Sequence, residues 1–410
     1  MVLFTPRTAC ALAFILALQL VPPRAAAAVE LSWSDVLARL EAQPELAATR
    51  AELAAAEGAL RAITLPNPEL EGSLGQAETL AGDETAEVWE WNASLALRPW
   101  GPWRHERSAA RAERDAAGHD LAQARREQER RLAARFWRVA HDQRLALVLG
   151  ERQAQLHRLV EIARLRAELG EARPTEPLRL EIELEQLAAE IRAAEAEALL
   201  NRQALGRRLG VEPPDDFSLV ADWDSLPPLP AGAGDPAPAH PLLAAETARA
   251  EGARAALAAA RADRWPGLRV GAFQSRELDA ESEGLSLALE LPLFDRRGGA
   301  VDRARAAAAA AGHRRAALAQ DYADALAAAQ VRARLARQQV ESLRREVLPR
   351  ATQALAALEA EYRVGEAGLV ELIDARRARS DTETELLTAQ LDYHLALAEL
   401  KALAPGDDHD

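Results

Sequence analysis

Cysteine, methionine and aromatic residues are scarce in this chain. Its 410 residues include one cysteine, one methionine and 4% aromatic residues, whereas 49% are hydrophobic, mostly alanine and leucine. The single Cys10 excludes a disulfide framework and a thiolate metal site. A hydrophobic fraction made of small, helix-forming residues favours long packed helices over a large aromatic core.

An excess of basic residues and the motifs of common enzymes are also absent. The chain has 50 Lys+Arg against 64 Asp+Glu, a formal net charge of −14. Nucleic acid is therefore excluded as a partner, because phosphate binding needs a basic face. The sequence has no Walker loop, GxSxG, Rossmann or HExxH motif, and no histidine pair at i, i+4. We therefore predict a non-enzyme without catalytic residues, metal ligands or a cofactor.

Long apolar runs are missing except for one short run at the start. Arg7 precedes an uncharged run from Thr8 to Val21, and small residues follow from Ala25 to Ala28. A positive start, a short apolar centre and small residues are typical of a secretory signal peptide, which we place at residues 1–28. An uncleaved anchor is the alternative. The cysteine-free remainder suits an oxidising periplasm.

The chain contains two similar halves. Pro44-Glu-Leu-Ala-Ala returns as Pro241-Leu-Leu-Ala-Ala, and Leu169-Gly-Glu-Ala returns as Val364-Gly-Glu-Ala, in the same order and at similar spacing. This indicates a tandem duplication of roughly 195 residues per unit. We predict repeats at 29–212 and 241–403, a Pro-rich connector at 213–240 and an acidic tail at 404–410. Phe217, Leu219, Val220 and Trp223 are the connector residues expected to pack against the helices.

Each repeat is predicted to run short helix, β-hairpin, long helix, short helix. The expected helices are Ser34–Ile63, Arg104–Leu169, a segment ending at Leu209, Pro241–Arg264, Gly299–Val364 and Leu369–Ala402. The expected strands are 69–76, 88–97, 268–275 and 285–291. A helix of about 66 residues is about 100 Å long, which implies a rod or coiled coil. The two short helices of a repeat should stack end to end beside the long one.

The strands carry a pattern typical of membrane hairpins. Alternation places Trp89, Trp91, Leu95 and Leu97 on one face, with polar residues on the other. Trp100 and Trp103 follow, so the tryptophans bracket the leucines as a membrane aromatic belt does. The alternative is an amphipathic hairpin packed on a soluble core. If the strands span lipid, four of them cannot close a barrel, and the chain must oligomerise.

Together these features resemble the TolC-type outer-membrane efflux proteins. Pro66-Asn-Pro-Glu-Leu and Leu97-Arg-Pro-Trp-Gly-Pro-Trp-Arg most resemble the cobalt–zinc–cadmium branch, although Trp100–Arg104 replaces that branch's usual Gly-Gly-Lys-Arg-like turn. The resemblance implies a mainly α, tandem-duplicated fold with a small β part. It also implies a homotrimer with a shared twelve-stranded barrel in outer-membrane lipid and a long periplasmic α-barrel. The implied partners are a periplasmic adaptor and an inner-membrane pump of the RND type.

The resemblance also implies functional residues at the turns between helices. Tyr362, Glu371 and Asp374 correspond to a pore gate, although Ala367 stands where the family has a gate arginine. Asp374 and Glu371 would form an acidic ring that favours cations, with Arg363 or Arg376 relieving the repulsion between carboxylates. The alternative is a pair of solvated carboxylates. The predicted adaptor-docking tips are Gly170, Glu171, Gly365 and Glu366.

Two functions agree with these features. The first is a passive duct that exports substrates, heavy-metal cations above all, from the inner-membrane pump across the outer membrane of a Gram-negative cell. The same duct could serve drug efflux or type I protein secretion. The second is a non-conducting periplasmic coiled-coil scaffold. A weak metal site at His409 is the remaining alternative to a solvated acidic tail in Asp407–Asp410.

Overall fold

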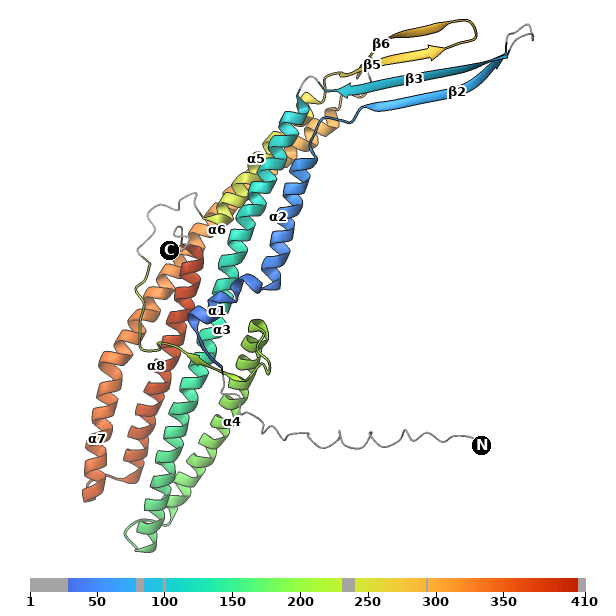
Figure 1. Ribbon diagram of the computed structural model, residues 1–410. Coiled ribbons are helices and arrows are strands. Elements are labelled where there is room, and N and C mark those ends of the chain that lie inside the picture. The colour runs from blue at the N-terminus through green and yellow to red at the C-terminus, as the bar shows by residue number, and fades with distance from the viewer. Residues whose placement is uncertain (1–28, 79–84, 99–100, 231–239, 293, 405–410) are drawn as a thin grey trace, which may run out of the picture.

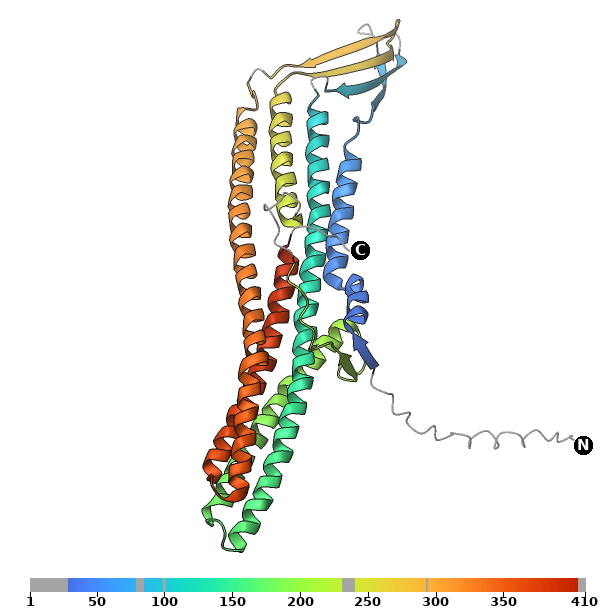
Figure 2. The same ribbon diagram turned by 90° about the vertical axis from the view of Figure 1, so that its left-hand side faces the viewer.

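The molecule is an elongated bundle of helices with a β-sheet at one end (Figures 1 and 2). This computed structural model describes residues 29–78, 85–98, 101–230, 240–292 and 294–404. The helices run side by side along the long axis, and the sheet projects from their upper ends (Figure 1). The two interhelical turns lie together at the opposite end, which we call the tip (Figure 2). None of the helices in the described ranges combines the length and apolar composition needed to span a bilayer.

The first repeat begins with a break that the sequence analysis missed. Its elements are β1 (Val29–Ser32), α1 (Trp33–Ala38), the 3₁₀ turn η1 (Leu40–Ala42), α2 (Pro44–Ala62), β2 (Glu69–Glu78), β3 (Thr85–Leu97), α3 (Pro102–Glu168) and α4 (Thr175–Leu209). The single helix predicted from Ser34 to Ile63 is wrong. Ser32 caps α1 with Asp35 in a capping box. Pro44 has no N–H to continue that helix and instead opens α2 at its first turn.

The second repeat has the same order of elements with one interruption. After β4 (Phe217–Val220) in the connector come α5 (Pro241–Ala262), β5 (Gly267–Arg276), β6 (Glu281–Glu290), α6 (Gly298–Ser342), the π-helical turn η2 (Leu343–Val347), α7 (Leu348–Val364) and α8 (Leu369–Leu403). The uninterrupted helix predicted from Gly299 to Val364 is therefore wrong. Pro349 lacks an N–H, and its ring would collide with the carbonyl of Arg345 in a regular α-helix. The wider π turn accommodates it.

The helices pack as the sequence analysis predicted. Helices α2 and α4 both pack on α3, while α5 and α8 both pack on α6. The two short helices of each repeat are thus arranged end to end beside the long one (Figure 2). Helix α3 also packs on α5 and α8, which joins the two repeats into one bundle.

The two hairpins form a single antiparallel sheet in the order β2-β3-β5-β6. The joining pair is β3 with β5, in a register that places Leu95 opposite Val270 and Leu97 opposite Leu268. All four strands are longer than predicted, by one to four residues at their ends, except that β6 ends one residue earlier. Within the described residues, β2 and β6 each keep one edge without a partner strand.

The connector packs on the middle of the bundle. Phe217 and Trp223 are buried, with 2% and 9% of their surfaces exposed, whereas Val220 is exposed. Strand β4 pairs in parallel with β1, which sequence analysis did not predict. The indole N–H of Trp223 donates to Gln390 of α8 over 2.7 Å. The connector therefore holds the start of the first repeat and the last helix of the second together.

Candidate functional site: the sheet and the helical tip

The sheet has one apolar face and one polar face. Residues directly opposite each other in an antiparallel register share a face. The apolar face carries Leu70, Leu74, Trp89, Trp91, Leu95, Leu97, Leu268, Val270, Leu285, Leu287 and Leu289. Toward the β5–β6 hairpin the same face becomes polar, with Gln274, Arg276, Glu281 and Glu283. The polar face carries Glu69, Glu71, Ser73, Glu90, Asn92, Ser94, Arg269, Ser275, Ser282, Ser286 and Glu290. Leu285 and Leu287 are 88% and 74% exposed, so no layer of described residues covers this part of the apolar face.

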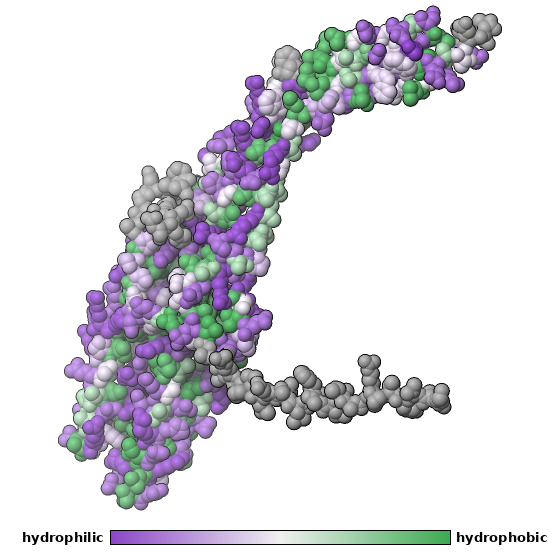
Figure 3. Space-filling view, viewed as in Figure 1, coloured by the Kyte–Doolittle hydropathy of each residue, from purple (hydrophilic) through white to green (hydrophobic). Residues whose placement is uncertain are grey.

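Three of the four predicted belt tryptophans lie within the described residues. Trp89 lies in the hairpin half of β3 and Trp91 at its midpoint, where the ring of Trp91 covers Gly72 so closely that a Cβ there would be 2.4 Å from it. Trp103 lies at the start of α3, below the opposite end of the sheet, and is 36% exposed. Trp100 lies outside the described residues. Figure 3 shows both green, hydrophobic and purple, hydrophilic side chains on the sheet, while purple predominates along the helical body.

Sequence analysis missed two further exposed aromatic side chains at the sheet–helix junction. Trp265 is 62% exposed just before β5, and Phe294 is fully exposed between β6 and α6. Their positions could have indicated a place in the aromatic belt, because both lie within a few residues of a strand end. Nearby, Arg98 and Arg297 both form ion pairs with Asp263, which connects the ends of β3, α5 and α6.

The predicted docking tips have the same backbone geometry in both repeats. Gly170 and Gly365 have φ angles of +75° and +82°, the left-handed conformation that glycine adopts without strain. The N–H of Glu171 donates to the Arg166 carbonyl over 2.9 Å, and that of Glu366 donates to the Glu361 carbonyl over 2.9 Å. Each turn is thus a Schellman motif with an exposed glutamate. The match supports the duplication, while the docking role stays a prediction.

The three predicted gate residues lie near the tip in different surroundings. Tyr362 stacks under the guanidinium of Arg166, 4.9 Å from its ring centroid, and so bridges the two helical pairs. Glu371 caps α8 by accepting the Gly368 N–H over 2.9 Å. Asp374 is exposed and has no hydrogen bond or ion pair among the described residues. Arg376, expected beside the acids, pairs instead with Glu359.

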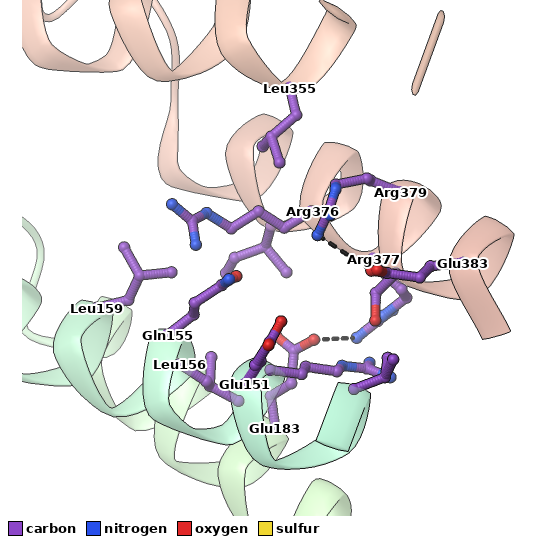
Figure 4. Close-up of a pocket in the computed structure, with 14 residues that line it drawn as sticks. Glu151, Gln155, Leu156, Leu159, Glu183, Leu355, Arg376, Arg377, Arg379 and Glu383 are labelled. Atoms are coloured by element: carbon purple, nitrogen blue, oxygen red, sulfur yellow. Dashed lines mark hydrogen bonds and ion pairs between the residues drawn. The ribbon is translucent and has the colours of Figure 1, made fainter. Parts of the chain in front are cut away.

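A cleft separates the α3–α4 pair from the α7–α8 pair just above the tip (Figure 4). Leu156, Leu159, Leu355 and Ile373 form its apolar part. Arg377 of α8 reaches across to Glu183 of α4 over 3.2 Å. Arg379 and Glu383 pair along α8. The two helical pairs are therefore held together by a small apolar cluster and a few partly exposed charge contacts.

The middle of the bundle contains a buried histidine that was not singled out in the sequence. His394 is 2% exposed, and its ring stacks on Trp137 with centroids 3.4 Å apart. Its Nε2 atom has no hydrogen-bond partner among the described residues. Burial lowers the pKa of His394 to about 4, with a smaller contribution from Lys401. The histidine is therefore neutral in the folded protein at pH 7.

We expect this histidine to make the fold sensitive to mild acid. Its folded pKa lies below the ordinary 6.5, so the unfolded chain takes up a proton first as the pH falls. The free energy of unfolding should fall by about 2 kcal/mol between pH 7 and pH 5 from this group alone. Denaturant unfolding of the parent and of His394→Phe at both pH values measures the effect. Equal pH dependence in the two proteins would contradict it.

Within the described ranges, no three histidine, cysteine, aspartate or glutamate side chains gather in a group that could hold a metal ion. The acidic tail with His409 lies outside those ranges. The candidate site consists of the apolar sheet face, the polar sheet face and a tip with exposed carboxylates.

Comparison with known proteins finds a family match over the second half of the chain and one similar relative over most of its length. Residues 238–406 match the family described as outer membrane efflux protein. The cobalt-zinc-cadmium resistance protein CzcC of Cupriavidus metallidurans is 27% identical over 340 residues, which cover 81% of this chain and 79% of the relative. The predicted resemblance to outer-membrane efflux proteins is thus confirmed.

Solved structures of the same fold cover nearly the whole chain. The Neisseria gonorrhoeae outer membrane channel MtrE, in its open state, has a TM-score of 0.78 at 19% identity and covers 90% of this chain and 88% of its own. CusC, reported for its transmembrane channel formation, has a TM-score of 0.78 at 18% identity and covers 91% and 92%. These similarities confirm the predicted mainly α, tandem-duplicated fold.

Proposed function

We propose that this protein is the outer-membrane duct of an efflux system, built as a homotrimer. The observation that carries the proposal is a four-stranded sheet with an exposed apolar face, at the end of a bundle whose longest helix has 67 residues. An exposed apolar face suits lipid, and a helix of that length reaches about 100 Å into the periplasm. The polar face would then line an aqueous lumen.

The sheet edges support a trimer. Strands β2 and β6 would leave backbone N–H and C=O groups without partners, which a hydrocarbon environment does not tolerate. Pairing β2 of one copy with β6 of the next closes the sheet, and three copies supply twelve strands. The exposed Schellman turns at the tip would meet a periplasmic adaptor, which connects the duct to an inner-membrane RND pump.

The similarity to CzcC supports heavy-metal cations as the cargo. Clustered carboxylates at a constriction favour cations and repel anions. Asp374 is the better candidate for this role, because it has no partner among the described residues, whereas Glu371 is engaged as a helix cap. Drug efflux and type I secretion remain alternative uses of the same duct, and a non-conducting scaffold is the second candidate function.

Replacing Asp374 with asparagine is expected to weaken divalent-cation block of the channel or to raise its resting conductance. Removing three carboxylates from a narrow opening removes a site that attracts cations. Single-channel recording in a planar bilayer measures both quantities. Asp392→Asn, about five helical turns further from the tip, is the matched control, because Asp392 is also exposed and has no ion pair among the described residues. Recordings of Asp374→Asn that match the parent in both quantities would overturn the acidic-ring assignment.

Membrane fractionation separates the duct from the scaffold. The duct predicts a heat-modifiable trimer in the outer-membrane fraction on gel electrophoresis. A soluble, elongated species in the periplasmic fraction would favour the scaffold.

A further inference from the structure

The π turn η2 is the only break in the two long helices within the described residues, and it occurs in one repeat only. Helix α3 runs from Pro102 to Glu168 without interruption. At the repeat offset of about 195, Ala154 of α3 corresponds to Pro349. The proline and the π turn thus give the second long helix a flexible point that the first lacks.

The helical segments on the two sides of η2 differ in packing. Helix α6 buries Ala329, Ala333 and Val340 completely. Helix α7, between η2 and the tip, contains no buried residue. Its partly buried Leu355 and Tyr362 contact the hydrophobic cluster at the tip. Helix α7 is therefore less buried than α6, and the π turn η2, where the backbone hydrogen bonding changes, joins the two helices.

The connector packs against the π turn η2. Arg344, inside η2, donates to the backbone carbonyl of Asp224 over 2.9 Å and to its carboxylate over 2.8 Å. Leu343, also inside η2, is buried in a cluster against which Leu226 and Leu229 of the connector pack. The same connector segment is fixed to α8, because Tyr393 donates to the Pro227 carbonyl.

We propose that η2 is a hinge for α7 and that connector residues Trp223–Leu229 are the latch that sets its angle. The latch holds the turn from one side through Arg344 and is anchored to α8 through Trp223 and Pro227. Because the connector follows α4, it also links the hinge to the mid-bundle end of the α3–α4 pair. The functional role of the hinge rests on the proposed duct, because α7 ends at the tip. The motion of α7 can be measured without an export assay.

The proposal predicts two opposite effects on the motion of α7. Arg344→Ala removes both contacts to Asp224, and should raise amide hydrogen exchange in residues 348–364 about fivefold, which corresponds to about 1 kcal/mol for a partly exposed charged contact. Pro349→Ala restores a backbone N–H in the first turn of α7, just after η2. Because this donor can make the hydrogen bond that proline cannot, amide exchange in residues 348–364 should slow. Exchange in α3 should be unchanged in both variants.

Hydrogen exchange with mass spectrometry on the full-length protein tests the proposal. Arg345→Ala is the matched control, because Arg345 is the next residue of the turn, is exposed, and has no side-chain hydrogen bond or ion pair among the described residues. Asp224→Ala should give a smaller increase in the same segment, and serves if Arg344→Ala does not fold. Equal exchange in Arg344→Ala and the parent, or an equal rise in Arg345→Ala, would overturn the hinge. A non-conducting protein with the predicted exchange would overturn the duct and leave the hinge standing.

Discussion

Replacing Trp223 with alanine is expected to lower the free energy of unfolding by about 3–5 kcal/mol, the usual cost of removing a buried tryptophan. The side chain fills space beside Trp137 and His394, with ring centroids 5.9 Å away in each case. Its loss also leaves the buried Gln390 carbonyl oxygen without its donor. Because the connector joins β1, α3 and α8, the loss should weaken the contact between the repeats. Denaturant unfolding followed by circular dichroism measures it.

Two further variants separate burial from hydrogen bonding. Trp223→Phe retains most of the apolar surface but removes the N–H, and should cost about 1–2 kcal/mol. Trp103→Ala, at a partly exposed tryptophan outside the cluster, should have little effect on unfolding. A Trp223→Ala protein as stable as Trp103→Ala would contradict the role given to the connector.

Replacing Leu289 or Leu95 with arginine is expected to impair membrane insertion by about 2–4 kcal/mol, the cost of a mid-bilayer charge on the lipid face of a barrel. Both leucines lie on the apolar face: Leu289 is opposite Leu268, and Leu95 is opposite Val270. The yield of heat-modifiable trimer in the outer-membrane fraction measures the effect.

The neighbouring residue provides the control. Ala288 is exposed and lies on the polar face opposite Arg269, so Ala288→Glu adds a charge one residue away that neither faces lipid nor opposes a like charge. Its assembly should be close to that of the parent. Normal assembly of Leu289→Arg and Leu95→Arg would show that these leucines do not face lipid.

The order of elements could be predicted because local signals determine it. Proline and glycine end the helices, alternation marks the strands, and the repeat fixes the spacing of both. The pairing of β3 with β5 could not be predicted, because it joins residues about 180 positions apart and no local signal specifies it. The π turn was missed because a proline in a long helical pattern can kink, end or locally widen a helix, and surrounding packing decides which.

The candidate site was predictable to a smaller extent. Gly170 and Gly365 could be placed at turns because glycine suits the left-handed conformation that they adopt. The cap made by Glu371 depends on where α8 begins, and the stacking of Tyr362 on Arg166 depends on how two distant turns meet. Neither follows from sequence spacing. The connector latch escaped prediction for the same reason, since Arg344 and Asp224 are 120 residues apart.

Conductance of the purified full-length protein in a planar lipid bilayer tests the central claim most directly. The account predicts discrete conductance steps that appear only with the heat-modifiable trimer and disappear when it is dissociated by heating. A trimer that inserts into the bilayer but produces no conductance under any applied voltage or divalent-cation concentration would contradict the duct.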